Sequence, residues 1–122
     1  MIKIKVMLSC RPKLLSEVIR NLIERQPDME VVGEVVDPIE LIFALRLKPV
    51  DVVIITPIKA KGNPRICRQL CKKHPRLIIL ILTMESEALY IYKSGSNRKK
   101  IERPSGISIM SNIRSSIPWP AF

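Results

Sequence analysis

The chain has 122 residues, of which 47% are hydrophobic, and it carries a net charge of +10. This length suits one domain that buries its core without disulfides, and the hydrophobic share excludes an intrinsically disordered chain. No apolar run approaches the roughly 20 residues needed to cross a bilayer, and the first residues lack the layout of a signal peptide. With three cysteines, an odd number, the sequence predicts a cytoplasmic protein without a disulfide framework.

Four short apolar runs predict the strands of a sheet. Each run is rich in β-branched residues and is bounded by polar or turn-forming residues. The run at 51–56 has no polar face, so we expect it to be covered on both sides, as the central strand of a parallel sheet. The four predicted strands are residues 2–8, 29–36, 51–56 and 77–82.

Amphipathic patterns between these runs predict three helices. Apolar residues recur at spacings of three and four after Pro12 and after Asp37-Pro38, and a proline is typical of the first turn of a helix. The third helix is predicted to follow Pro64 and to end at His74-Pro75. The predicted helices therefore span about 12–25, 38–48 and 64–74.

The C-terminal part has weaker patterns. A short helix is predicted over residues 85–93, followed by Gly95, which is typical of a helix C-cap. Residues 96–105 are polar and basic and predict a loop, whereas Gly106–Met110 alternates well enough for a short fifth strand. Residues 111–117 predict a short last helix.

The alternation of strands and helices predicts an α/β fold. With a right-handed crossover at each connection, the elements predict a doubly wound, flavodoxin-like, five-stranded parallel sheet in the order 2-1-3-4-5, with an irregular C-terminal part. This order brings the carboxyl ends of the first and third strands side by side. We expect one domain over residues 1–117 and a tail over residues 118–122.

The ordered set of runs resembles the receiver domain of two-component response regulators, the CheY-like fold, of the type found ahead of LuxR-like DNA-binding domains. The resemblance extends over about residues 2–96 in order and spacing. The stretches that carry it are residues 4–8, 30–35, 51–55, 74–84 and Lys93-Ser94-Gly95-Ser96. It implies a role in phosphorelay signal transduction.

Receivers hold Mg²⁺ with an acidic pair after the first strand and accept a phosphoryl group on an Asp that ends the third strand. The matching positions here are Ser9, Cys10 and Thr56, which supply neither the carboxylate oxygens that Mg²⁺ prefers nor a carboxylate nucleophile. Thr83 matches the hydroxyl residue that reads the phosphoryl group. Asp51 lies at the other end of the same strand and therefore cannot replace the missing phosphoacceptor at position 56. The resemblance thus indicates a pseudo-receiver with a degenerate phosphoacceptor pocket, without metal or cofactor.

The cysteines offer two further candidate sites. Cys67, Cys71 and His74 recur at helical spacing, but structural zinc needs four converging ligands, and the two cysteines share an apolar stripe. We therefore interpret both as core residues. Cys10 is predicted near a helix N-terminus, which lowers a thiol pKa, although an inert small residue in the vacated pocket is the favoured interpretation.

Basic residues gather in the last quarter of the chain, where residues 91–122 hold half of the net charge of +10. Such a cluster is either a solvated loop or a contact surface for nucleic acid or an acidic partner. Its residues are Lys93, Arg98, Lys99, Lys100 and Arg103.

These observations favour a signalling module that acts through phosphorylation-independent protein–protein contacts and is not an enzyme. We expect a protein partner, a signalling or transcription component, and no membrane association, and a homodimer stays open. The alternative is a small basic nucleic-acid-binding protein that uses residues 93–103. An enzyme on a flavodoxin-like sheet is disfavoured because the sequence shows no catalytic set, and the fold alone does not decide the function.

Overall fold

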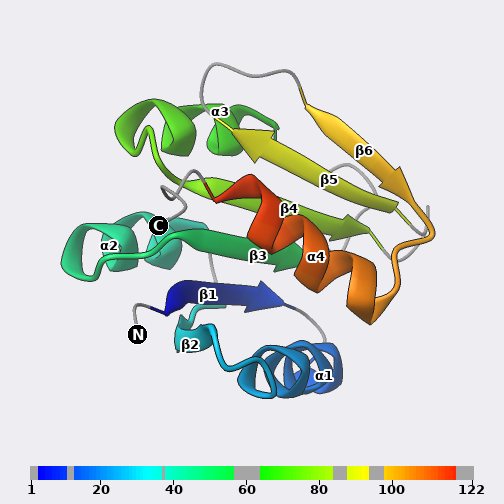
Figure 1. Ribbon diagram of the computed structural model, residues 1–122. Helices are drawn as coiled ribbons and strands as arrows, with labels where there is room; N and C mark the ends of the chain where they lie inside the picture. Colours follow the sequence, from blue (N-terminus) through cyan, green and yellow to red (C-terminus); the bar gives the residue numbers. More distant parts are fainter. Residues whose placement is uncertain are drawn as a thin grey trace, which may run out of the picture.

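The computed structural model describes residues 3–10, 13–36, 38–56, 64–83, 88–93 and 98–117. Within these ranges the chain forms six strands and four helices (Figure 1). The strands are β1 (Ile4–Cys10), β2 (Met29–Glu34), β3 (Val52–Thr56), β4 (Ile78–Thr83), β5 (Ala88–Lys93) and β6 (Lys99–Glu102). The helices are α1 (Lys13–Glu24), α2 (Pro38–Leu47), α3 (Pro64–Lys73) and α4 (Gly106–Ser116). Gly95 and the expected tail at 118–122 lie outside the described residues.

The six strands form one sheet in the order β2-β1-β3-β4-β5-β6. β1 pairs in parallel with β2 and β3, and β3 pairs in parallel with β4. The pairs β4–β5 and β5–β6 are antiparallel. The predicted parallel core is therefore confirmed, with β3 between β1 and β4. Val52, the first residue of β3, lies in register with Val6 and Ile78 and has no exposed surface.

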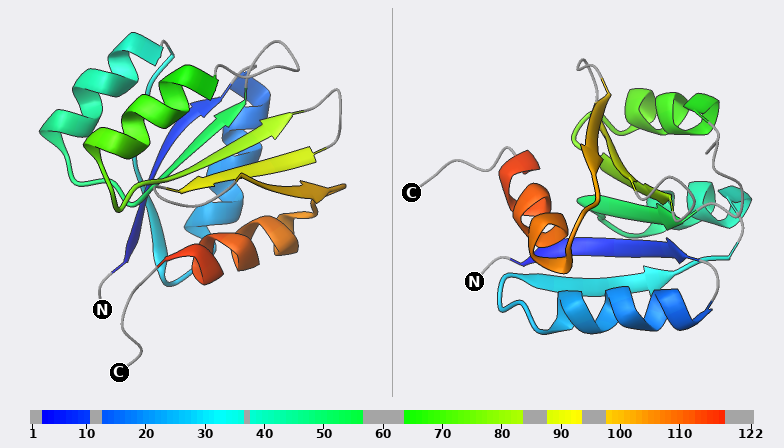
Figure 2. Two further views of the ribbon diagram at one scale, coloured as in Figure 1. Left: turned by 90° about the horizontal axis from the view of Figure 1, so that it is seen from above. Right: turned by 90° about the vertical axis from the view of Figure 1, so that its right-hand side faces the viewer.

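Alternate residues of the strands bury two separate cores, because successive side chains point to opposite faces of a sheet. On one face Val6 and Ile54 pack with residues of α1 and α4. On the other face Met7 and Val53 pack with residues of α2 and α3. Figure 2 shows the two helix layers on opposite sides of the sheet. No helix in the described ranges is long and apolar enough to cross a membrane.

The prediction of a helix over residues 85–93 is wrong, because residues 88–93 form strand β5. Leu89 and Ile91 are buried on the α1–α4 face, whereas Tyr90 and Tyr92 pack, half-buried, on the α2–α3 face. Aromatic and β-branched residues in such alternation suit a strand that is covered on both faces. The apolar run is short, and a short run does not by itself distinguish a strand from a buried helix.

The loop predicted over residues 96–105 contains strand β6, which pairs with β5 at the edge of the sheet. The five-stranded, wholly parallel sheet in the order 2-1-3-4-5 is therefore wrong beyond the fourth strand. Arg103, just after β6, has a φ of 48°, a left-handed backbone conformation that turns the chain towards α4.

The predicted strand over residues 106–110 is also wrong, because these residues begin helix α4. Ser105 and Ser108 form a capping box at its start: the Ser108 N–H donates to Ser105 Oγ at 3.1 Å, and the Ser105 N–H donates to Ser108 Oγ at 2.7 Å. The inner face of α4 consists of Ile109, Met110 and Ile113. Their helical spacing outweighs the short alternation at 106–110.

Contacts with α1 and the turn before β2 hold α4 in place. Arg114 Nε donates to Asp28 Oδ2 at 2.7 Å, and a terminal nitrogen of Arg114 donates to Asp28 Oδ1 at 2.9 Å. A Cβ on Gly106 would lie 3.2 Å from Leu22 Cδ2, so glycine permits the helix start to approach α1 closely. The C-terminal segment thus completes the core that α1 begins.

Candidate functional site

The four predicted pocket residues lie along the carboxyl edge of the parallel strands. Cys10 and Thr56 are register partners at the ends of β1 and β3, and Ser9 is the partner of Ile55. Thr83 ends β4. The prediction that these four positions share one edge of the sheet agrees with the described strands.

The pleat divides the four residues between the two faces of the sheet. Cys10 and Thr56 continue the alternation of the buried residues on the α1–α4 face. Ser9 and Thr83 continue the alternation on the α2–α3 face. The sequence placed all four in one pocket, whereas the strands place Cys10 and Thr56 side by side on one face and Ser9 and Thr83, which are separated by β3, on the other.

Burial controls the chemistry of Cys10. Desolvation raises the pKa of its thiol from the ordinary value of 9.0 to about 11, although a hydrogen bond with the Thr56 side chain acts in the opposite direction. The Cys10 Sγ donates to the Ile54 carbonyl oxygen at 3.6 Å. The thiol is therefore protonated at neutral pH, which favours the inert interpretation of Cys10 over a reactive thiol.

The two threonines at this edge are buried, with 3% of Thr56 and 2% of Thr83 exposed. Thr83 Oγ1 donates to the carbonyl oxygen of Ala88 at 3.2 Å. Ala88 is the first residue of β5, so this bond joins the two ends of the β4–β5 connection. Thr83 consequently has a structural task at the strand end where the resemblance implies a phosphoryl contact.

The donor set at this edge does not fit the Mg²⁺ that a receiver fold implies. Ser9, Cys10 and Thr56 offer hydroxyl and thiol groups, whereas a hard divalent cation prefers carboxylates. In the part of the chain that the structure describes, no three His, Cys, Asp or Glu side chains are grouped so that they could hold a metal ion. Glu85 and Glu87, in the connection after β4, lie outside the described residues.

The candidate zinc ligands on α3 are core residues. Cys67 and Cys71 are buried with 2% and 6% exposed, and both pack in the core of the α2–α3 face. Burial raises the pKa of Cys67 to about 11. These observations match the interpretation of both cysteines as small apolar residues.

Asp51 lies at the amino edge as predicted, where its Oδ2 accepts from the Lys5 N–H at 2.9 Å.

The basic cluster does not form one surface. Lys100 is the register partner of Tyr90, and by alternation Arg98 shares its face, which is the α2–α3 face. Lys93 and Lys99 lie on the other face by the same alternation. Arg103 lies in the turn before α4. The segment was predicted to be a loop, and its strand pairing now separates cations that are adjacent in sequence.

Two of these cations contact an aromatic ring that the sequence did not single out. The Arg98 guanidinium carbon lies 4.7 Å from the centre of the Tyr90 ring, and Lys100 Nζ lies 5.9 Å from it. A hydrogen bond with the Tyr92 side chain raises the pKa of the exposed Arg98. The alternation of Leu89 and Ile91 with the tyrosines was the sequence signal for this arrangement, since it assigns both rings to one face.

Comparison with known proteins supports the same class of domain. No family model matches the chain, and no curated protein matches it. A LuxR-family two-component response regulator from Aurantimonas sp. SI85-9A1 is 29% identical with a TM-score of 0.59, and the match covers 67% of this chain and 59% of that one. RcsB from Salmonella enterica serovar Typhimurium, bound to promoter rprA, is 26% identical with a TM-score of 0.59, over 67% of this chain and 43% of that one.

The isolated REC domain of the same RcsB matches 92% of this chain and 72% of its own length, with a TM-score of 0.59 and 21% identity. The chain thus has a receiver-like α/β fold with a parallel core, extended by an antiparallel hairpin. More particularly, it is structurally similar to the receiver domains of LuxR-family response regulators. The chain spans about three-fifths and two-fifths of the two longer regulators that it matches.

Proposed function

We propose that this chain is a receiver-like signalling module that acts through phosphorylation-independent contacts with a protein partner. The observation that carries the proposal is the uncharged pair Cys10–Thr56 at the carboxyl edge of β1 and β3. A thiol with a pKa of about 11 and a hydroxyl are both neutral at neutral pH, so the pair attracts no divalent cation. Neither group replaces a carboxylate as phosphoryl acceptor without a base beside it.

The bond from Thr83 to Ala88 adds support. This hydroxyl is engaged in a hydrogen bond within the fold, at the position where the resemblance implies a phosphoryl contact. The fold similarity to receivers, which extends to 92% of the chain in one comparison, supports the signalling class.

Magnesium titration followed by NMR tests this proposal. The backbone amides of Cys10 and Thr56 are expected to show no saturable shift with Mg²⁺, because neither residue, nor Ser9 beside them, carries a carboxylate. The control is the variant that carries Ser9→Asp, Cys10→Asp and Thr56→Asp, which is expected to gain saturable shifts. Saturable binding to the unchanged protein at these amides would overturn the proposal.

Nucleic-acid binding is a second candidate function, favoured by the cluster of Tyr90, Arg98 and Lys100 on one face of the β5–β6 hairpin. Basic groups beside an aromatic ring suit single strands, which bind through phosphate contacts and base stacking. Arg68 and Lys72 are exposed on α3, the helix next to β5 on this face. Arg98 and Lys100 already lie against the Tyr90 ring, so a nucleic-acid base has to displace them from the ring or stack on the Arg98 guanidinium.

Fluorescence anisotropy with a labelled single-stranded oligonucleotide tests this candidate. Arg98→Ala with Lys100→Ala is expected to weaken binding and to lower the salt slope by about 0.7 for each phosphate that the variant no longer neutralises. Lys93→Ala with Lys99→Ala is the matched control, since it removes the same charge from the other face. Equal weakening in both variants, or binding that is flat with salt, would exclude the candidate.

A further inference from the structure

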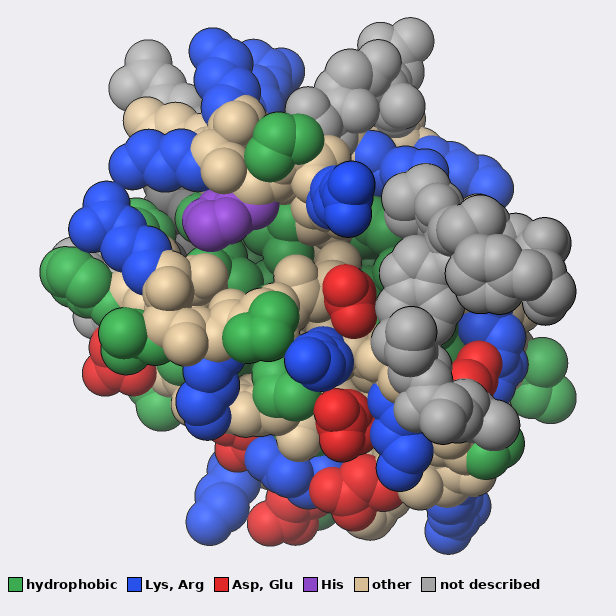
Figure 3. All heavy atoms as spheres, turned by 60° about the vertical axis from the view of Figure 1, so that its left-hand side comes forward, with side chains coloured by type: hydrophobic (Ala, Val, Ile, Leu, Met, Phe, Trp, Pro, Cys, Tyr) green, Lys and Arg blue, Asp and Glu red, His purple; other side chains and the backbone are tan. Residues whose placement is uncertain are grey.

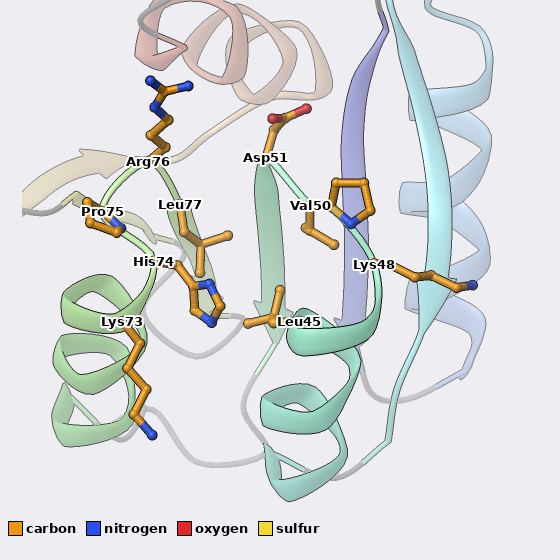
Figure 4. Close-up of a pocket in the computed structure, with 10 residues that line it drawn as sticks. Leu45, Lys48, Val50, Asp51, Lys73, His74, Pro75, Arg76 and Leu77 are labelled. Carbon is orange, nitrogen blue, oxygen red and sulfur yellow. The ribbon is translucent and has the colours of Figure 1, made fainter.

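A pocket of about 420 Å³ lies at the amino edge of the sheet, on the opposite side from Cys10 and Thr56. It opens between the C-terminal ends of α2 and α3, where the chain enters β3 and β4 (Figure 4). Its volume falls within the range of about 300–1,000 Å³ that is typical of ligand pockets. We call it the amino-edge pocket. Its lining includes Leu45, Lys48, Asp51, Lys73, His74, Arg76 and Leu77.

The bottom of the amino-edge pocket is apolar and held by the fold. Leu45 and Leu77 are 7% and 2% exposed, and the His74 ring turns towards them (Figure 4). The His74 N–H donates to the Leu70 carbonyl oxygen at 2.9 Å, and the Leu77 N–H donates to the His74 carbonyl oxygen at 2.9 Å. These bonds fix the backbone between α3 and β4, so the pocket is largely formed before a ligand arrives.

The rim of the amino-edge pocket is cationic. Lys48, Lys73 and Arg76 are exposed, and in Figure 4 their side chains extend outwards from the hollow in different directions. None of the three belongs to an ion pair among the described residues. Figure 3 looks onto a face where the histidine borders a hollow with hydrophobic side chains inside, and with Lys and Arg side chains and an acidic side chain around it.

Among the described residues, Asp51 is the only carboxylate that lines the pocket, and it forms a hydrogen bond within the sheet. Asp51 Oδ2 accepts from the Lys5 N–H at 2.9 Å, which ties the start of β3 to β1. Lys48 Nζ donates to the Val32 carbonyl oxygen at 3.3 Å, a hydrogen bond that does not neutralise its charge. Asp51 likewise keeps its charge, so the three cations Lys48, Lys73 and Arg76 outnumber the one carboxylate, and this positive excess attracts an acidic ligand.

We propose that the amino-edge pocket binds an acidic peptide segment of a protein partner, with one apolar side chain resting on the bottom formed by Leu45, His74 and Leu77. Carboxylates on either side of that apolar residue face Lys73 and Arg76. Charge complementarity selects this occupant: a second copy of a chain with net charge +10 meets the cationic rim with like charge. The inference rests on the proposed function, because it identifies the chemistry of the partner that the module contacts.

The probe for this proposal is a fluorescein-labelled pentapeptide with a central leucine and two aspartates on each side. Saturable binding is expected by anisotropy, with NMR shifts at the amides of residues 45–51 and 73–77. Lys73→Glu with Arg76→Glu is expected to weaken binding about tenfold, since two attractive pairs become repulsive. A peptide with serine in place of leucine is expected to bind more weakly, because it leaves the apolar bottom unfilled.

The matched control is Lys72→Glu with Arg68→Glu, which reverses two exposed charges on α3 that do not line the pocket. Equal weakening in this control, equal binding of the serine peptide, or shifts elsewhere on the protein would overturn the proposal. Circular dichroism verifies that each variant is folded. The test involves no Mg²⁺ or phosphodonor. If the peptide does not bind, only the proposal of an acidic partner is rejected. If Mg²⁺ binds at Cys10 and Thr56, the proposed phosphorylation-independent function is rejected instead.

Discussion

The two parts of the sheet differ in how their strands are joined. In the parallel part, β2, β1, β3 and β4 are connected through helices that cross over the sheet, as parallel strands require. In the antiparallel part only residues 84–87 separate β4 from β5, a connection far too short for a crossover. The length of the connection decides the direction of the next strand. Strands that are similarly apolar therefore pair in parallel where a helix connects them and antiparallel where a short connection does.

The two parts also differ in what they bring to the surface. The parallel part supplies the uncharged pair Cys10–Thr56 and, at its other end, the cationic amino-edge pocket. The antiparallel part supplies the hairpin with Tyr90 and Arg98. It also supplies Ala88, whose carbonyl oxygen accepts a hydrogen bond from the Thr83 hydroxyl. Both parts nevertheless share one core, because Leu89 packs in the same cluster as Val6 and α4.

The largest expected effect tests whether the two parts unfold together. Ile113 of α4 has no exposed surface and packs in the shared cluster. Ile113→Ala is expected to lower the free energy of unfolding by about 2–5 kcal/mol, because it removes buried methyl groups and leaves a cavity. Urea denaturation followed by circular dichroism measures this decrease.

Ile107→Ala in the same helix is the matched control, since Ile107 is 85% exposed. Its expected change is within about 0.5 kcal/mol. If Ile113→Ala leaves the unfolding midpoint unchanged, or splits the transition into two, the antiparallel part and α4 do not belong to the core of the parallel part.

A smaller effect concerns the Cys10 thiol of the uncharged pair in the parallel part. With a pKa of about 11 in place of 9.0, Cys10 holds roughly 100-fold less thiolate at neutral pH than an unfolded cysteine. Alkylation by iodoacetamide, followed by mass spectrometry, is therefore expected to be at least about 100-fold slower in the native chain than in urea. Rapid native labelling of Cys10 would contradict the raised pKa of its thiol.

The smallest effect concerns the contact between Arg114 and Asp28, which ties α4 to the parallel part. Both side chains are more than a quarter exposed, so Arg114→Ala is expected to cost less than about 1 kcal/mol at neutral pH. The Arg114 hydrogen bonds lower the pKa of Asp28 below its ordinary value of 3.8. The stabilisation is thus present above pH 3.8 and is lost as the pH falls through the lower folded pKa.

Urea denaturation of both proteins at neutral pH and in acid measures this pH dependence. The stability difference between Arg114→Ala and the unchanged chain should shrink in acid, as Asp28 becomes protonated. Arg25→Ala, which removes an exposed arginine just after α1, is the control. A difference that is constant with pH, or equal in the control, would show that the contact contributes nothing.

The parallel part could be predicted from the sequence because each element has a strong local pattern. The apolar run at 52–56 and the helical stripe of α1 each specify one structure. The run at 88–93 is short and apolar throughout most of its length, so periodicity alone did not separate helix from strand. The capping box at Ser105 and the stripe of α4 were readable, but the alternation at its start competed with them.

The candidate sites divide in the same way: those at strand ends could be predicted from the sequence, and those that depend on strand pairing or on distant helix ends could not. The positions of Cys10 and Thr56 came from strand ends, which the sequence located well. The contact of Arg98 with Tyr90 depends on the register of β5 and β6, which only the paired strands define. The amino-edge pocket joins residues from the ends of two helices that are far apart in sequence, so no local pattern predicts it.

The most direct test of the account is incubation with radiolabelled acetyl phosphate and Mg²⁺, followed by detection of an acid-stable, base-labile acyl phosphate. The unchanged protein and Thr56→Asp are both expected to remain unlabelled, because a carboxylate nucleophile and an acidic metal site are needed together. The variant that combines Ser9→Asp, Cys10→Asp and Thr56→Asp is expected to regain some uptake. Stoichiometric labelling of the unchanged protein would contradict the central claim that this receiver-like module acts without phosphorylation.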